Sequence, residues 1–216
     1  MTGMSVLGIF AKQPQPGRVK TRLCPPLTPL QAAELYRCSL QETVDLAARG
    51  AWTRMLFYRG ERRYFRNSFP DVPLTEQRGA DLGERLAEAF ASRFAEGARK
   101  VVIIGSDSPD LPPTLIGEAF AALNQYDAVV APADDGGYVL IGLRRNVPEL
   151  FTDIPWSTDR VLAVTRQRMT EHRLSFLKLP GWYDLDDVAG LRQIMRRSPK
   201  SGTARLAARL LDGTAP

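Results

Sequence analysis

Residues 101–113, VVIIGSDSPDLPP, constrain the fold more than any other segment. The segment opens with four β-branched apolar residues, a run typical of a strand buried on both faces of a sheet. Gly105 lets the backbone turn, and Asp107 and Asp110 follow the carboxyl end of that strand. Two prolines then open a helix predicted over residues 114–123. Because open α/β sheets bind ligands beyond the carboxyl ends of their strands, this segment predicts an α/β fold with a site at that edge.

The two aspartates of this segment have two interpretations. Carboxylates delivered to the edge of a sheet suit a metal–phosphate site. Alternatively, each side chain caps the helix that follows. The metal site is favoured for Asp107, which lies closer to the strand end, and capping is favoured for Asp110.

Hydrophobic patterns predict an alternation of strands and helices along the whole chain. Such an order indicates a three-layer α/β/α fold with one mixed, mostly parallel sheet. We expect a single domain over residues 1–216, with a core over about 4–197 and a basic tail over 198–216. The strands are predicted over residues 6–11, 55–58, 74–77, 101–104, 127–131, 139–143 and 174–179. The main helices are predicted over residues 29–49, 81–94, 114–123, 188–197 and 204–211, with a further helix that Ser157 or Thr158 caps and that ends near Glu171.

Several classes of protein are excluded by composition. No stretch is long and apolar enough to span a bilayer, and the first apolar run lacks the basic start of a signal peptide. The two cysteines predict neither a disulfide framework nor a zinc site, so we expect a reduced, cytoplasmic setting. The basic C-terminal helices lack interleaved aromatic residues, which favours a solvated helix face over a nucleic-acid surface.

The net charge of +5 is concentrated near the N-terminus, because residues 1–60 hold eight Lys or Arg and three Asp or Glu. Four of these cations occupy one loop that contains no acid: Lys12, Arg18, Lys20 and Arg22. Prolines stiffen this loop, and Gly17 allows close backbone approach. A loop of this kind attracts a compact anion such as a phosphate chain.

Three further segments have both a structural and a functional interpretation. Asp134-Asp135-Gly136-Gly137 predicts a tight hairpin turn, or bare backbone against a ligand. Trp156 is either a core anchor or a wall for a substrate ring. Residues 79–83, GADLG, line a pocket or form only the entry to a helix.

The acidic cluster at residues 184–187, DLDD, is the natural partner for Asp107. Mg²⁺ and Mn²⁺ favour oxygen ligands, and need only one or two carboxylates when substrate phosphates complete the shell. Capping of the next helix is the alternative, and it is most plausible for Asp187. The sequence contains no Walker P-loop, no nucleophile elbow and no Cys–His signature for covalent catalysis.

Five blocks in order, FAKQPQPGRVKTRL, GSDSPDLP, DDGGYVLIGL, PWSTDRVL and WYDLDDVAGL, resemble the DUF2064 family. That family is placed among the nucleotide-diphospho-sugar transferases of the GT-A fold, and is related to the molybdopterin and phospholactate nucleotidyltransferases. The resemblance runs from about Val6 to Leu191.

The resemblance implies a role for each matching position. Nucleotide and phosphate contacts are expected from Lys12, Gly17, Lys20, Arg22 and Ser106. Asp107 resembles the metal-binding aspartate, although Asp107-Ser108-Pro109-Asp110 is not a strict D-x-D. Asp184 and Asp186 resemble the late acidic motif that gives a second metal contact, and Asp186 is the preferred member. Alternation along an extended segment would place Asp184 on the same side as Asp186 and Leu185 on the other side. The acceptor-side residues are expected to be Gly136, Gly137, Tyr138 and Trp156, with Asp135 as the candidate proton acceptor.

Three functions remain open on these grounds. The first is a glycosyltransferase that uses Mg²⁺ or Mn²⁺ and moves a sugar from a nucleotide sugar to a small acceptor. The second is a nucleotidyltransferase that couples a nucleoside triphosphate to a phosphate- or carboxylate-bearing substrate and releases pyrophosphate. The third is a nucleotide-binding module without catalysis, against which the acids in two separate loops count. The oligomeric state is not predicted.

Overall fold

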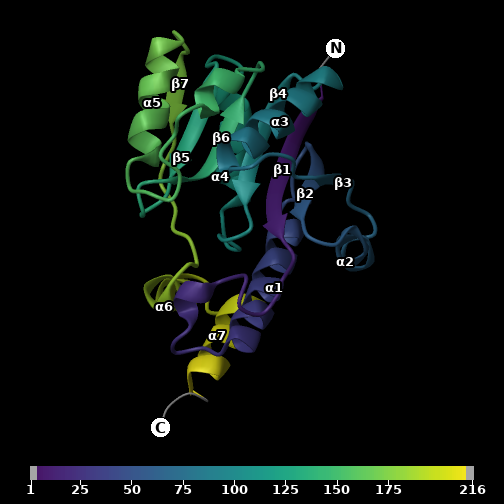
Figure 1. The fold of residues 1–216 in the computed structure, drawn as a ribbon, viewed down its shortest axis with the longest axis vertical. Helices are drawn as coiled ribbons and strands as arrows, with labels where there is room; N and C mark the ends of the chain where they lie inside the picture. The colour runs from purple at the N-terminus through teal and green to yellow at the C-terminus, as the bar shows by residue number, and fades with distance from the viewer. Residues whose placement is uncertain (1–3, 213–216) are drawn as a thin grey trace.

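The computed structural model describes residues 4–212, within which seven strands form one sheet in the order β3-β2-β1-β4-β6-β5-β7 (Figure 1). In this described sheet β6 runs antiparallel to its neighbours β4 and β5, while the other pairs are parallel. The predicted three-layer, mostly parallel α/β fold is therefore confirmed. The strands are β1 (Ser5–Lys12), β2 (Thr53–Arg59), β3 (Leu74–Glu76), β4 (Lys100–Gly105), β5 (Ala128–Pro132), β6 (Tyr138–Leu143) and β7 (Phe176–Lys178).

Both faces of the sheet are buried because apolar residues fill both sets of alternating positions. In β1, Leu7 and Ile9 belong to one core cluster and Val6 to the other. Helices α1, α2 and α4 cover the first face, and α3 and α5 cover the second. The helices are α1 (Pro29–Leu46), α2 (Arg62–Ser68), α3 (Leu82–Ala95), α4 (Pro113–Ala122), α5 (Val161–Glu171), α6 (Val188–Arg197) and α7 (Gly202–Asp212), with short 3₁₀ turns at Thr21–Leu23 and Pro148–Phe151.

The strand order reverses at β1. The chain leaves β1 for β2 and β3 on one side, and then returns to form β4 on the other side. The carboxyl ends of β1 and β4 consequently lie side by side while their connections run in opposite directions. Such a switch point leaves a crevice above the strand ends, which is where ligands bind in open α/β sheets.

Local signals account for several helix ends. Thr28 and Gln31 form the reciprocal capping box of α1, and Asp187 caps α6 by accepting a hydrogen bond from the Gly190 amide at 2.9 Å. The prediction that Asp110 caps α4 is wrong, because α4 begins after Pro112 without any side-chain cap. The prediction that Ser157 or Thr158 caps α5 is also wrong, because the helix begins at Val161 without a side-chain cap.

The basic tail contains the helix that is predicted over residues 204–211, which the structure shows as α7, while residues 213–216 lie outside the described part. Helix α7 packs against α1 and α6, and Ala204, Leu206 and Ala207 are buried there (Figure 1). The Glu42 carboxylate on α1 accepts hydrogen bonds from the Gly202 and Thr203 amides and from the Thr203 hydroxyl. The N-terminus of α7 is thereby satisfied by a side chain from α1.

The hairpin between β5 and β6 depends on a glycine. Gly136 has φ 86°, and a Cβ there would lie 2.2 Å from the carbonyl oxygen of Asp159. The Gly136 carbonyl also accepts a hydrogen bond from the Leu162 amide at 2.9 Å. The predicted tight turn is present, and it docks against the segment that enters α5.

No helix within residues 4–212 is long and apolar enough to cross a bilayer.

Candidate functional site

A cavity of about 810 Å³ opens beyond the carboxyl ends of β1 and β4. The last residue of β1 and the loop after it contribute four cations to its wall: Lys12, Arg18, Lys20 and Arg22. The end of β4 contributes Ser106 and Asp107, and the loop between β7 and α6 contributes Asp186. Segments that are far apart in the sequence therefore meet at the switch point of the sheet.

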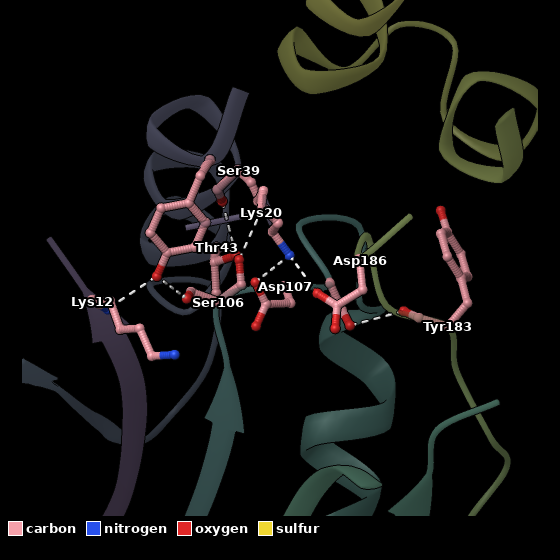
Figure 2. Close-up of polar contacts among 10 residues, drawn as sticks. Lys12, Lys20, Ser39, Thr43, Ser106, Asp107, Tyr183 and Asp186 are labelled. Carbon is pink, nitrogen blue, oxygen red and sulfur yellow. Dashed lines mark hydrogen bonds and ion pairs between the residues drawn. The ribbon is translucent and has the colours of Figure 1, made fainter. Parts of the chain in front are cut away.

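Lys20 lies at the centre of the acidic part of this cavity. Its ammonium contacts Asp107, and it donates a hydrogen bond to Asp186 Oδ1 at 2.9 Å (Figure 2). The Lys20 side chain is 3% exposed, whereas each carboxylate side chain is 43% exposed. Burial would lower the pKa of Lys20, but the two carboxylates outweigh burial and hold that pKa above its ordinary value. Lys20 is therefore a permanent cation that links the loop after β1 to both acidic loops.

The ends of β1 and β4 are tied together by hydroxyl groups from α1. The Tyr36 hydroxyl accepts a hydrogen bond from the Lys12 amide at 3.0 Å and shares another with the Ser106 hydroxyl at 2.7 Å. The Ser39 hydroxyl donates to the Ser106 carbonyl at 2.9 Å. Burial raises the pKa of Tyr36, so the phenol keeps its proton. These bonds fix the backbone that presents Lys12 and Asp107.

Asp184 carries an unusual carboxylate. Burial, followed by the negative charges of Asp135, Asp186 and Asp107, raises its pKa to about 7. Its Oδ1 is buried and makes no hydrogen bond within the described residues. By contrast, the pKa of Asp186 lies below its ordinary value, because attraction by Lys20 outweighs the effect of burial. The negative charge of Asp184 is therefore not offset by its surroundings, and a cation beside it would relieve that charge.

The donor chemistry of this acidic part fits Mg²⁺ or Mn²⁺. Both ions prefer oxygen ligands, and an unpartnered buried carboxylate oxygen beside two further aspartates suits them. Among residues 4–212, no three Asp, Glu, His or Cys side chains are gathered as a ready-made metal cage. A cation held here would accordingly draw its remaining ligands from a substrate.

The expected acceptor side is only partly inside the cavity. Tyr138 and Trp156 line it, with their rings in an edge-to-face contact at 6.4 Å, so Trp156 forms a wall of the cavity. Gly136, Gly137 and Asp135 are not among the lining residues, and Asp135 Oδ1 accepts a hydrogen bond from the Gly137 amide at 2.9 Å. The tight turn thus positions Tyr138 rather than exposing bare backbone.

Gly17 and Asp184, which were expected to contact phosphate and metal, are not among the residues that line the cavity. Gly17 has φ 73°, and no atom lies within 4 Å of the place where its Cβ would be. A positive-φ turn therefore accounts for this glycine.

The lining of the cavity also contains residues that the sequence did not indicate. Gln77, Arg85 and Tyr36 line the cavity, together with Asp81 and Leu82 from the GADLG segment. The Gln77 side chain donates hydrogen bonds to the carbonyls of Phe57 and Ala11 at 2.8 and 3.2 Å. The Arg85 guanidinium donates to the carbonyls of Gly79 and Ala80 at 3.0 and 2.8 Å. The bonds of Gln77 have no local sequence pattern, because its two partners lie 20 and 66 positions away.

Comparison with known proteins places the chain in a family and a fold. Residues 42–158, more than half of the chain, match a family model described as an uncharacterized protein conserved in bacteria (DUF2064). The crystal structure of a candidate nucleotide-diphospho-sugar transferase from Desulfovibrio desulfuricans G20 is 36% identical in sequence, with a TM-score of 0.90 over 97% of this chain and 96% of that one. No curated protein matches the chain.

Two more distant structures share the fold. CMP:2-keto-3-deoxy-manno-octonic acid synthetase, complexed with CTP, is 11% identical, with a TM-score of 0.59 over 96% of this chain and 100% of that one. Rv0371c from Mycobacterium tuberculosis H37Rv, complexed with manganese, is 19% identical, with a TM-score of 0.53 over 90% of this chain and 100% of that one.

Proposed function

The chain belongs to the DUF2064 family, and from that premise we propose that it is a metal-dependent glycosyltransferase, which moves a sugar from a nucleotide-sugar donor to a small acceptor. The observation that carries this proposal is the contact of Lys20 with both Asp107 and Asp186 on the wall of one cavity. The 36% identical relative, which is a candidate nucleotide-diphospho-sugar transferase, supports the choice of donor.

The cations of the loop after β1 would bind the diphosphate of the donor. Lys12, Arg18 and Arg22 line the same cavity as Lys20, and cationic side chains stabilise phosphate oxygens by charge-assisted hydrogen bonds. Arg22 lowers the pKa of Asp186 by its charge, so it lies within electrostatic reach of the acidic part. The loop would thus offset the negative charge that grows on the leaving nucleoside diphosphate.

Asp107 and Asp186, which line the cavity, would hold the cation, and Asp184 would add a neighbouring negative charge from outside the lining. A bound Mg²⁺ or Mn²⁺ would supply further positive charge at the diphosphate. Tyr138 and Trp156 would orient the acceptor across the cavity, because aromatic rings offer a flat apolar face to a sugar-like or ring-shaped molecule. Asp135 is our candidate for taking the proton from the acceptor hydroxyl; its charge acts on Asp184, so it lies near the acidic part.

A nucleotidyltransferase is the second candidate, and the number of cations favours it. Four basic side chains from one loop line the cavity, and a triphosphate carries more negative charge to offset than a diphosphate does. In this alternative a phosphate or carboxylate of the second substrate would attack the α-phosphorus, and pyrophosphate would leave. The same residues would bind the phosphates, so the two candidates differ in the donor.

The donor can be identified by thermal unfolding with Mn²⁺ and a panel of nucleotide sugars and nucleoside triphosphates. A ligand at a hundredfold excess over its dissociation constant adds about 2.7 kcal/mol, which is roughly 5–10 °C in Tm for a chain of this size. We expect one nucleotide sugar to give such a shift with the wild type, and Asp107→Ala to lose both the shift and the transfer activity. Asp45→Ala, which removes an exposed aspartate from α1, should keep both.

A shift with one triphosphate alone would favour the nucleotidyltransferase. Transfer activity retained in Asp107→Ala would refute the metal site in either case.

A further inference from the structure

Asp110 joins the two acidic loops although it does not line the cavity. Its carboxylate accepts hydrogen bonds from Trp182 Nε1 at 3.2 Å, from the Tyr183 hydroxyl at 2.6 Å and from the Ser198 hydroxyl at 2.7 Å. Trp182 and Tyr183 precede the acidic residues of the loop between β7 and α6, and Ser198 follows α6. One carboxylate therefore binds both ends of the segment that carries Asp186.

Two further hydrogen bonds join the same loops on the side nearer the cavity. The Ser108 hydroxyl donates to the Tyr183 carbonyl at 2.8 Å, and the Leu185 amide donates to the Asp107 carbonyl at 2.8 Å. Trp182 still pairs with Ala133 beside the sheet, and the chain then leaves the sheet edge. From that point Asp186 is held beside Asp107 by these hydrogen bonds together with the Lys20 ion pairs and the burial of Leu185.

The partners of Asp110 are themselves held in place. The rings of Trp182 and Tyr183 stack at 5.7 Å, and the Arg197 guanidinium lies 4.0 Å from the centre of the Trp182 ring. Burial, with Asp110 as the next cause, raises the pKa of Tyr183, so its hydroxyl keeps the proton that it donates. The aromatic pair is therefore oriented before any substrate binds.

We propose that Asp110 is a positioning residue, which holds the Asp186 loop against the Asp107 loop and so sets the spacing of the two carboxylates that would bind the divalent cation. The metal-binding part of this proposal rests on the proposed function. Asp110 itself would contact neither the cation nor the donor. Removal of a residue that orients a metal ligand through a hydrogen bond typically lowers metal affinity or activity by about 10–100-fold.

Asp110→Asn tests the proposal because it keeps the shape of the side chain and turns one hydrogen-bond acceptor into a donor. With the purified protein and Mn²⁺ alone, we expect the affinity to fall by about tenfold or more, measured from the paramagnetic resonance signal of free Mn²⁺. Hydrogen exchange should show a second effect, which is faster exchange of the Leu185 amide with unchanged exchange in the central strands.

Glu42→Gln is the matched control, because the Glu42 carboxylate also accepts three hydrogen bonds that join distant segments. This variant should lower the Tm to a similar degree, yet leave the Mn²⁺ affinity within twofold of the wild type and Leu185 protected. The difference between the two variants separates positioning of the acidic loop from a general loss of stability.

The outcomes distinguish this proposal from the proposed function. If Asp110→Asn binds Mn²⁺ and protects Leu185 as the wild type does, or if Glu42→Gln weakens Mn²⁺ binding equally, the positioning role is refuted. If the wild type binds no Mn²⁺ while Asp110→Asn still exposes Leu185 to exchange, the metal-dependent function fails and Asp110 remains the residue that holds the acidic loop.

Discussion

Replacing Lys20 by methionine removes the charge that separates Asp107 from Asp186 and keeps most of the side-chain volume. At 2.9 Å from Asp186 Oδ1, the ammonium gains about 6 kcal/mol of gross attraction at an effective dielectric constant of 20. Burial of the ammonium offsets much of this energy, and water screens carboxylates that are 43% exposed. An exposed ion pair contributes about 0–1 kcal/mol, and breaking a buried pair costs about 3–5 kcal/mol. We expect Lys20→Met to lower the free energy of unfolding by an intermediate amount, about 2 kcal/mol, at neutral pH.

The loss should depend on pH in a predictable direction. In the wild type the pKa of Asp186 is lowered, so the stability that it contributes is present above its unfolded pKa of about 3.9 and is lost as the pH falls through the lower folded value. In Lys20→Met the attraction that lowers the pKa of Asp186 is lost, so this pKa rises. Asp186 will then take up a proton on mild acidification, and the difference in unfolding free energy between variant and wild type will narrow.

Urea unfolding at pH 7.5 and 4.5 measures this difference, and Lys100→Met provides the control. The Lys100 ammonium on β4 donates to the Phe120 carbonyl and to the Asn124 side chain, which are neutral acceptors. Its replacement should therefore cost the same at both pH values. If Lys20→Met lowers the free energy of unfolding equally at both pH values, as Lys100→Met should, or does not lower it at pH 7.5, the Lys20 charge does not stabilise the fold in this way.

Two further predictions concern other parts of the site. Because burial and neighbouring charges raise the pKa of Asp184 to about 7, its ionisation destabilises the metal-free fold as the pH rises above about 4. Asp184→Asn should therefore raise the Tm at pH 8 and change it little at pH 4 in a thermal-unfolding series, and an unchanged Tm at pH 8 would contradict the assigned pKa. Gly136→Ala should lower the Tm by roughly 5 °C or more, since the added Cβ meets the Asp159 backbone and the positive φ adds strain. Gly117→Ala, where a Cβ meets nothing within 4 Å in α4, should keep or raise the Tm, and equal losses in the two variants would show that close backbone contact is not the cause.

The sequence carried enough information for the sheet and for the three residues at the centre of the site. Buried apolar runs and helix caps are local signals, so β4 and the cap at Asp187 could both be predicted. Lys20, Asp107 and Asp186 were recognisable because charged residues beyond strand ends meet at one edge of a sheet.

Residues that act across long distances could not be predicted in the same way. The partners of Asp110 lie 72, 73 and 88 residues away, so its local position before two prolines suggested a helix cap instead. Glu42 caps the first residues of α7, which lie 160 positions further along the chain, so no neighbouring residue indicates this role. Gln77 likewise bonds to carbonyls of β1 and β2, whose place depends on strand order rather than on any nearby residue.

The ion pair between Lys20 and Asp186 joins residues that are 166 positions apart. At a synthesis rate of roughly 5–20 residues per second, about 8–33 seconds pass on the ribosome between the two residues. During that interval the loop after β1 already carries its cations, while the carboxylate of Asp186 does not yet exist. The nascent chain would therefore present an anion-attracting loop to phosphate compounds and RNA around it well before it has a complete site.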